Sequence, residues 1–463
     1  MPPRKPMEHV VVLIPGITGS VLQQRGKDVW APSGGAVLRA LRTLGGSIKK
    51  LTLGDDPVDK PELEDGVTAP RIMPDIHLIP ELWKIDGYST TSKWLRQTFE
   101  LDPGKNYFEF QYDWRRDNRV AAKKLASDAD QWLHAWRNGD GPNDAKLILV
   151  GHSMGGLIAR YYLECLEGWR DTKTLITLGT PFRGSLNALG FIANGFSKGI
   201  GPFDVNLSEL LRSFTSVYQL LPIYPCYDDG QGGDLKRTYE VAIPNLDQER
   251  AKAAWEFHDE ISKAVENHKN DDEYQQSPYE TKTVIGTFQP TWLSAKKQSG
   301  GVELLRTYPD SEPDGDGTVP RVSASPPEYK RERNATRASE QHASLQNNQA
   351  VLVEIAGTMT TEDLTRFRKP PGIPLSLDVE DMFSTEEKIP VLARPNESVR
   401  DQLQAVVADA GTGAEVTSSP LRADPDGSHT VELPPLPEGA YRLTVSGGTV
   451  ESVTDVFVVA SAG

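Results

Sequence analysis

The residues best suited to chemistry in this chain are Gly151-His152-Ser153-Met154-Gly155, which follow an aliphatic run at 147–150 and precede a helix-compatible stretch at 156–163. A strand that turns this sharply into a helix needs small residues two places before and after the central serine, because a β-carbon there would collide with backbone. Gly151 and Gly155 fill these places. The pattern predicts that Ser153 is a nucleophile above the carboxyl end of a sheet, beside the free N–H groups of the next helix. The alternative is a tight turn with no chemical role.

A serine hydroxyl becomes a good nucleophile only when a histidine accepts its proton and an acid orients that histidine. In enzymes with this turn the three residues occur in the order Ser, Asp, His, and His342 fits as the base. Four other histidines fit less well. His258 and His268 precede the candidate acids, His152 adjoins the serine, and His429 lies in the C-terminal segment. The alternative for His342 is a surface residue that caps the helix expected from about 345.

Two aspartates in the sequence Asp314-Gly315-Asp316-Gly317 are candidates for the acid, and we prefer Asp316 to Asp314. A Ca²⁺ loop is the alternative for this pair, but the other carboxylates of such a loop, including its terminal glutamate, are lacking. We therefore predict no metal and no cofactor.

An acyl-transfer site also needs two N–H donors for the negative oxygen of the tetrahedral intermediate. One donor is normally the amide that follows the nucleophile, here Met154, and the other comes from a loop after an earlier strand. The loop Pro15-Gly16-Ile17 follows a predicted strand at 10–14, so Ile17 is the second predicted donor. The alternative is that this loop is only a tight turn.

The surrounding sequence alternates strand-like and helix-like segments from residue 10 to about 358, which predicts a mostly parallel sheet covered on both faces. We expect an α/β-hydrolase domain over residues 1–368, with an apolar cap inserted at about 186–260. A proline-containing linker at 369–385 precedes short alternating strands at 386–463, which predict a small all-β, immunoglobulin-like sandwich.

Net charge and the distribution of apolar residues exclude some classes of function. The formal net charge of −15 argues against a nucleic-acid partner, and no apolar run approaches the ~20 residues of a membrane span. The first residues lead directly into a strand without a signal peptide, and Cys165 and Cys226 are expected to be free thiols. We therefore expect a cytoplasmic protein.

Taken together and in order, several motifs resemble the lecithin:cholesterol acyltransferase family over about residues 8–358. Besides the serine turn they are Pro15-Gly16-Ile17-Thr18-Gly19-Ser20, Tyr112-Asp113-Trp114-Arg115, Gly179-Thr180-Pro181-Phe182-Arg183-Gly184-Ser185, residues 213–222 and Asp314-Gly315-Asp316-Gly317-Thr318-Val319. The resemblance implies the same roles for Ser153, Asp316, His342, Ile17 and Met154.

The resemblance also implies an enzyme that moves a fatty acyl group from a phospholipid to a sterol, another alcohol or water. Secreted animal members have a signal peptide and a disulfide near the cap, and this chain has neither, so a phospholipase or general esterase is preferred to sterol transfer. A thioesterase or carboxylesterase, and a non-catalytic adhesion or scaffold protein, are the alternatives. The expected partner is a lipid or other acyl ester; transient contact with a membrane surface, and a protein partner for the C-terminal sandwich, stay open.

Overall fold

The computed structural model describes residues 3–31, 48–79, 83–200, 203–309, 314–329, 335–360 and 372–460. Its centre is a six-stranded sheet in the order β16-β13-β9-β8-β1-β7, in which all paired strands run parallel. The bounds are β1 (Val10–Ile14), β7 (Tyr107–Glu109), β8 (Leu147–His152), β9 (Thr172–Leu178), β13 (Glu280–Gly286) and β16 (Ala335–Ala338). Every residue of β1 and β8 is buried, as a sheet covered on both faces requires.

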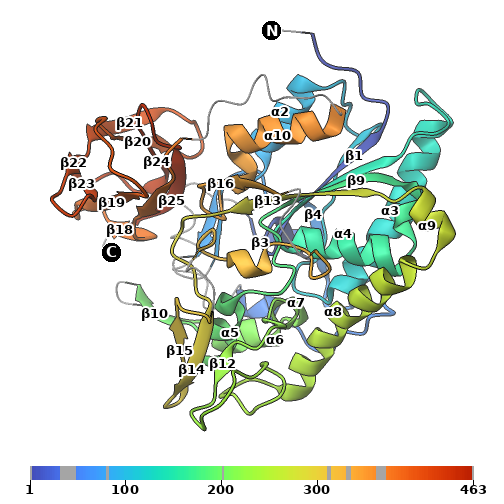
Figure 1. Ribbon diagram of the computed structural model, residues 1–463, viewed down its shortest axis with the longest axis horizontal. Coiled ribbons are helices and arrows are strands. Elements are labelled where there is room, and N and C mark those ends of the chain that lie inside the picture. Colours follow the sequence, from blue (N-terminus) through green and yellow to red (C-terminus); the bar gives the residue numbers. More distant parts are fainter. Residues whose placement is uncertain are drawn as a thin grey trace.

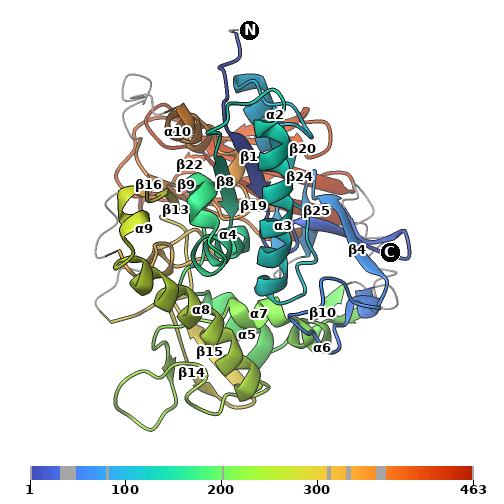
Figure 2. The same cartoon turned by 90° about the vertical axis from the view of Figure 1, so that its right-hand side faces the viewer.

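Helices cover both faces of this sheet (Figure 1), with α2 and α10 on one side and α3 and α4 on the other. Figure 2 looks onto α3, α4 and α8. Aspartates set the start of three helices, because the carboxylates of Asp117, Asp247 and Asp271 accept N–H bonds in the first turns of α3, α8 and α9. The helices are α2 (Ser89–Thr98), α3 (Asn118–Arg137), α4 (Met154–Cys165), α8 (Gln248–His268), α9 (Asp272–Gln276) and α10 (Gln349–Thr360). This architecture is the expected α/β-hydrolase fold.

The segment between β9 and β13, two neighbouring strands of the central sheet, contains the range expected as the cap. No strand-like pattern was found in the sequence of this range, but the structure has three short strands in it. Residues 201–202 lie outside the described part of the chain. The elements are α5 (Leu186–Ala193), β10 (Ser197–Ile200), β11 (Phe203–Asn206), α6 (Ser208–Ser213), α7 (Thr215–Gln219) and β12 (Tyr227–Asp228). β12 joins the later hairpin of β14 (Ser294–Gln298) and β15 (Gly301–Leu305).

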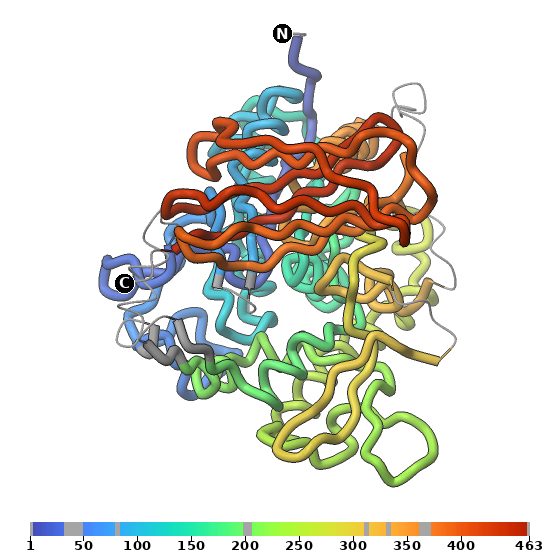
Figure 3. The backbone as a smooth tube through the Cα atoms, turned by 90° about the vertical axis from the view of Figure 1, so that its left-hand side faces the viewer, coloured from blue at the N-terminus to red at the C-terminus, as the bar shows by residue number. Residues whose placement is uncertain are grey.

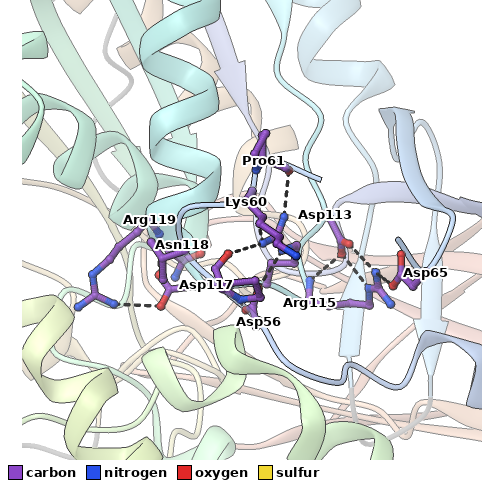
Figure 4. A network of polar contacts seen from close by, with 12 residues as sticks. Asp56, Lys60, Pro61, Asp65, Asp113, Arg115, Asp117, Asn118 and Arg119 are labelled. Carbon is purple, nitrogen blue, oxygen red and sulfur yellow. Dashed lines mark hydrogen bonds and ion pairs between the residues drawn. The ribbon is translucent and has the colours of Figure 1, made fainter. Parts of the chain in front are cut away.

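The segment between β1 and α2 adds smaller elements, namely η1 (Ile48–Leu51) and the strands β2 (Ser20–Gln24), β3 (Lys27–Trp30), β4 (Val67–Ile72), β5 (His77–Ile79) and β6 (Trp83–Ile85). Two arginines that follow β7 hold part of it (Figure 4). The fully buried Arg115 donates to Asp65 and Asp113, and Arg116 donates to Asp56 and to three backbone carbonyls. Because buried guanidinium groups need such partners, these bonds fix residues 56–65 beside the carboxyl end of the sheet.

The C-terminal strands form two sheets, in the orders β17-β19-β23-β22 and β18-β25-β24-β20-β21, that share an apolar core. Figure 3 shows them in orange and red as a layer against the rest of the molecule. They are β17 (Leu375–Asp378), β18 (Met382–Ser384), β19 (Ile389–Pro395), β20 (Gln404–Asp409), β21 (Glu415–Pro420), β22 (Arg422–Ala423), β23 (His429–Leu433), β24 (Gly439–Ser446) and β25 (Val453–Ala460).

The stretch expected as a linker, 369–385, differs from that expectation within the described residues. Leu375 and Leu377 point into the sandwich core and alternate with more exposed residues, so 375–378 pairs as strand β17, and 382–384 pairs with β25. Residues 369–371, with Pro370 and Pro371, and the ends 361–368 and 461–463 of the two expected domains lie outside the described residues. No helix in the described ranges is long and apolar enough to span a membrane.

Candidate active site

Ser153 lies between β8 and α4 in a strained backbone conformation, with φ of 52° and ψ of −126°. A positive φ is unfavourable for serine and is typical of residues that the surrounding fold holds in place. A β-carbon at Gly151 would approach Gly156 to 2.8 Å, and one at Gly155 would collide with the carbonyl oxygen of Ile14. Both glycines are therefore needed where the sequence pattern expects them.

Ser153, His342 and Asp316 come together although they are far apart in the sequence. The Ser153 Oγ lies 2.9 Å from Nε2 of His342, and Nδ1 of His342 lies 2.7 Å from Oδ2 of Asp316. The Asp316 side chain is fixed in turn, because its Oδ1 accepts N–H bonds from Thr318 and Val319 at 3.0 and 2.6 Å. All three residues are at least nine-tenths buried. This arrangement allows proton transfer from serine to histidine with the imidazole held by a carboxylate.

Asp314, the alternative acid, has other partners. Its Oδ1 accepts from the Phe288 N–H at 2.5 Å, and its Oδ2 lies 3.4 Å from the guanidinium of Arg321. These contacts leave Asp316 as the aspartate beside His342.

Of the competing histidines, His152 contacts the backbone carbonyl of His342, and the other three lie elsewhere. His258 contacts the Gln219 carbonyl and His268 contacts Glu164, while His429 is in β23 of the sandwich. Burial lowers the pKa of His258 to about 4, so this imidazole is neutral at physiological pH.

Of the two predicted oxyanion donors, Met154 lies in the serine turn and Ile17 lies in the loop after β1. Met154 is the first residue of α4, where an N–H has no acceptor within the helix. Ile17 follows Gly16, which is so close to the nucleophile that a β-carbon on Gly16 would lie 2.8 Å from Cβ of Ser153. Ile17 and Gly16 both line the pocket at Ser153. The oxyanion roles of Ile17 and Met154 stay predictions, which the nearness of Gly16 to Ser153 and the place of Met154 at the start of α4 support.

A buried hydrogen-bond chain that the sequence reasoning missed joins these parts. The Gly16 N–H donates to the Tyr88 hydroxyl at 2.9 Å, this hydroxyl lies 2.8 Å from Nδ1 of His152, and Nε2 of His152 lies 3.1 Å from the His342 carbonyl. Because a carbonyl only accepts, Nε2 of His152 carries the proton and Nδ1 accepts from Tyr88. Burial, with a smaller contribution from His342, lowers the pKa of His152 to about 3, so it stays neutral.

Two further glycines permit the close approach of the acid and the base. At Gly179, whose φ is 57°, a β-carbon would lie 2.9 Å from Oδ2 of Asp316 and 3.0 Å from Nδ1 of His342. A β-carbon at Gly286 would collide with Cβ of Asp316. The sequence signal for Gly179 is its place in the motif Gly179-Thr180-Pro181-Phe182-Arg183-Gly184-Ser185, whereas Gly286 was not singled out by any motif.

A pocket of about 290 Å³ opens beside Ser153 and His342. The cap contributes apolar side chains to it, including Ala188, Phe191, Val217 and Leu220. Its volume is close to the ~300 Å³ lower bound of typical small-molecule sites. The described ranges contain no group of three or more His, Cys, Asp or Glu side chains that could hold a metal ion.

Comparisons with known proteins agree with the motif-based interpretation. Residues 79–289 match the family model for Lecithin:cholesterol acyltransferase. An uncharacterized protein of Saccharomyces cerevisiae is 30% identical over 177 residues, which are 38% of this chain and 23% of that protein. The phosphatidylcholine-sterol acyltransferase of Mus musculus is 30% identical over 118 residues, or 24% of this chain and 25% of that protein. The matches thus span about a quarter of the length of these curated relatives.

Among solved structures, a lipase of Bacillus licheniformis in its mature form is 13% identical with a TM-score of 0.36, covering 78% of this chain and 95% of that one. The resemblance expected from the motifs is confirmed over the matched part of the chain, since residues 79–289 are similar to the lecithin:cholesterol acyltransferase family.

Proposed function

We propose that this protein is a serine hydrolase for lipid acyl esters, in which Ser153 forms an acyl-enzyme that water or an alcohol then cleaves. The observation that carries this proposal is the pair of contacts at His342, 2.9 Å to the Ser153 hydroxyl and 2.7 Å to the Asp316 carboxylate. The family match supports acyl-ester hydrolysis or acyl transfer in general.

In the proposed first half-reaction, the Ser153 oxygen attacks the ester carbonyl while Nε2 of His342 takes the hydroxyl proton. The carbonyl π electrons move to the oxygen, which the N–H groups of Ile17 and Met154 stabilise. When this intermediate collapses, the bond to the alcohol breaks and His342 returns the proton to the leaving oxygen. Asp316 keeps the imidazole in the required tautomer and stabilises the positive charge that it briefly carries.

In the second half-reaction, water or an alcohol attacks the Ser153 ester and His342 takes its proton. When this second intermediate collapses, the bond between the acyl carbon and the Ser153 oxygen breaks and His342 returns the proton to that oxygen. A fatty acid or a new ester is released and the serine hydroxyl is restored. A lipid acyl chain suits the apolar cap side of the pocket, because each buried methylene contributes about 0.8 kcal/mol. A thioesterase would use the same steps and differ only in its leaving group.

The test compares the parent with Ser153→Ala on p-nitrophenyl esters of short and long acyl chains. We expect a loss in kcat on the order of 10⁶ for the variant, which also should not react with a fluorophosphonate probe. Ser127→Ala, at an exposed position of α3, is the matched control and should behave as the parent. Equal rates for the parent and Ser153→Ala would refute the proposal.

A second experiment separates hydrolysis from transfer. The parent is incubated with a long-chain ester and an excess of a simple alcohol, and the products are separated by chromatography. A new ester that is absent with Ser153→Ala would establish transfer, while fatty acid alone would identify a hydrolase.

A further inference from the structure

The segment that carries His342 is bound on one side by the C-terminal sandwich. The Ser339 N–H donates to Glu451 at 3.0 Å, a carboxyl oxygen of Glu340 accepts from the Thr454 N–H at 2.7 Å, and the Gln341 side chain donates to the Leu377 carbonyl at 3.0 Å. Three consecutive residues before the candidate base therefore each have a partner in the sandwich.

Glu340 is the central link in this contact. It is 2% exposed, and its Oε1 accepts from the Gln341 N–H at 3.0 Å as well as from the Thr454 N–H. Its Oε2 accepts from Asn348 at 2.9 Å, just before α10. A buried carboxyl group is costly unless such donors surround it, so this side chain has one favourable position. That position ties the backbone next to His342 to β25.

Ion pairs fix the sandwich beside the same segment. Lys84 lies 3.0 Å from Asp455 and 2.5 Å from Asp381, while Arg442 contacts Asp86 at 2.5 Å. The Asp86 N–H in turn donates to the carbonyl of Ala343, directly after His342. The apolar core of the hydrolase part also includes Ala410, Ala440, Val456 and Val458 of the sandwich. Both ends of the His342 segment thus depend on this contact.

The sandwich also contributes to the pocket itself. Leu377, Val379, Asp381 and Asp455 line the cavity that Ser153 and His342 line from the other side. Leu377 is the residue whose carbonyl accepts from Gln341. A shift of β17 would therefore move the pocket wall and release the His342 segment together.

We propose that the C-terminal sandwich is a positioning part of the active site, which holds the His342 segment through Glu340 and Gln341 and forms one wall of the substrate pocket. This proposal rests on the serine-hydrolase function proposed above for its effect on catalysis. Glu340 and Gln341 are positioning residues in it, since their contacts act on the base through the backbone.

The experiment compares three full-length variants. Glu340→Ala removes the acceptor for Thr454, Glu340→Gln keeps an acceptor oxygen, and Val445→Ala weakens the sandwich core away from the hydrolase part. The measurements are the rate of fluorophosphonate labelling at Ser153, kcat and KM for an ester, and hydrogen exchange in the peptide 339–345. We expect Glu340→Ala to lower labelling and kcat at least tenfold with less change in KM, and to raise exchange in this peptide.

Glu340→Gln should recover most of the labelling rate, and Val445→Ala should keep the parent's rate despite a lower melting temperature. Parental labelling rate and parental hydrogen exchange in Glu340→Ala would overturn the proposal. Faster labelling would also overturn it, because the sandwich would then obstruct the site.

If Glu340→Ala does not fold, Arg442→Ala gives the same comparison, with an expected fall in labelling rate of about threefold. An unchanged labelling rate and unchanged hydrogen exchange would count against the proposal. If the parent itself is neither labelled nor active, the proposed function fails, and hydrogen exchange alone decides whether the sandwich holds this segment.

Discussion

Gly179 offers a direct test of the Asp316–His342 pair without changing either residue. A β-carbon at this position would lie 2.9 Å from Oδ2 of Asp316 and 3.0 Å from Nδ1 of His342, the two atoms that are 2.7 Å apart. Both distances are shorter than ordinary van der Waals contact, so the methyl group of Gly179→Ala must push the carboxylate or the imidazole away. We expect it to break the bond that orients the base.

The expected magnitude has two separate parts. A β-carbon at a φ of 57° costs about 1–2 kcal/mol of stability whatever surrounds it. Loss of the oriented acid in a serine triad lowers kcat by about 10⁴, which corresponds to about 5 kcal/mol in the activation barrier. Because Asp316 is displaced rather than removed, we expect kcat/KM to fall by about 10²–10⁴ while the protein stays folded.

Gly104→Ala is the matched control for this change. Gly104 has a φ of 79°, and a β-carbon added there would have no other atom within 4 Å, so alanine introduces the strain without the collision. Thermal unfolding should show a loss of stability in both variants, and a larger one in Gly179→Ala because of the added collision. Kinetics on a p-nitrophenyl ester should show lost activity in Gly179→Ala alone. Parental kcat/KM in Gly179→Ala would refute the reasoning, because the Asp316–His342 contact would then be unnecessary.

Three further predictions concern the candidate acid, the Tyr88 hydroxyl and the buried carboxyl group of Glu340. Asp316→Asn should lower kcat by about 10⁴, whereas Asp314→Asn should lower mainly the melting temperature, and the reverse order in a kinetic assay would favour Asp314 as the acid. Tyr88→Phe removes the hydroxyl between Gly16 and His152, so we expect kcat to fall about tenfold to hundredfold, and unchanged kinetics would contradict this role. Burial raises the pKa of Glu340 from an ordinary 4.5 to about 8, so the folded protein holds this proton over a pH range in which the unfolded chain loses it. The free energy of unfolding of the parent should therefore fall, relative to that of Glu340→Gln, as pH rises from 5 to 8; urea unfolding would show parallel pH profiles if the prediction is wrong.

The parts of the site that depend on local backbone could be predicted from the sequence. The serine turn is defined by residues within five positions of one another, and its glycines are required by contacts with Gly156 and Ile14 that any strand of this kind would make. The order of serine, acid and base along the chain follows from the strand order of the sheet. His342 could therefore be selected by elimination.

The choice between Asp314 and Asp316 needed the structure, because both lie on one loop and differ only in the direction of their side chains. Pairing of the Asp316 carbonyl with the His342 N–H at 2.8 Å puts its carboxylate beside the imidazole, while Arg321 and Phe288 contact Asp314. Tyr88 could not be found either, since 64 residues separate it from His152. No local pattern encodes a contact of that separation.

The sandwich was the least predictable part, because proline-containing sequence before it suggested a connector where β17 in fact joins a sheet. Its contact with the hydrolase part is rich in buried charge, and pairs such as Lys84–Asp455 add little net stability, because desolvation offsets their attraction. They do fix geometry, since sliding by one residue would leave each charge buried without its partner. An apolar contact of equal area would tolerate such sliding. A module that only needed to stay attached would not require these pairs, whereas one that positions a base within hydrogen-bond distance of a serine would. Comparing hydrogen exchange of the peptide 339–345 in Glu340→Ala and Val445→Ala distinguishes these two roles of the sandwich.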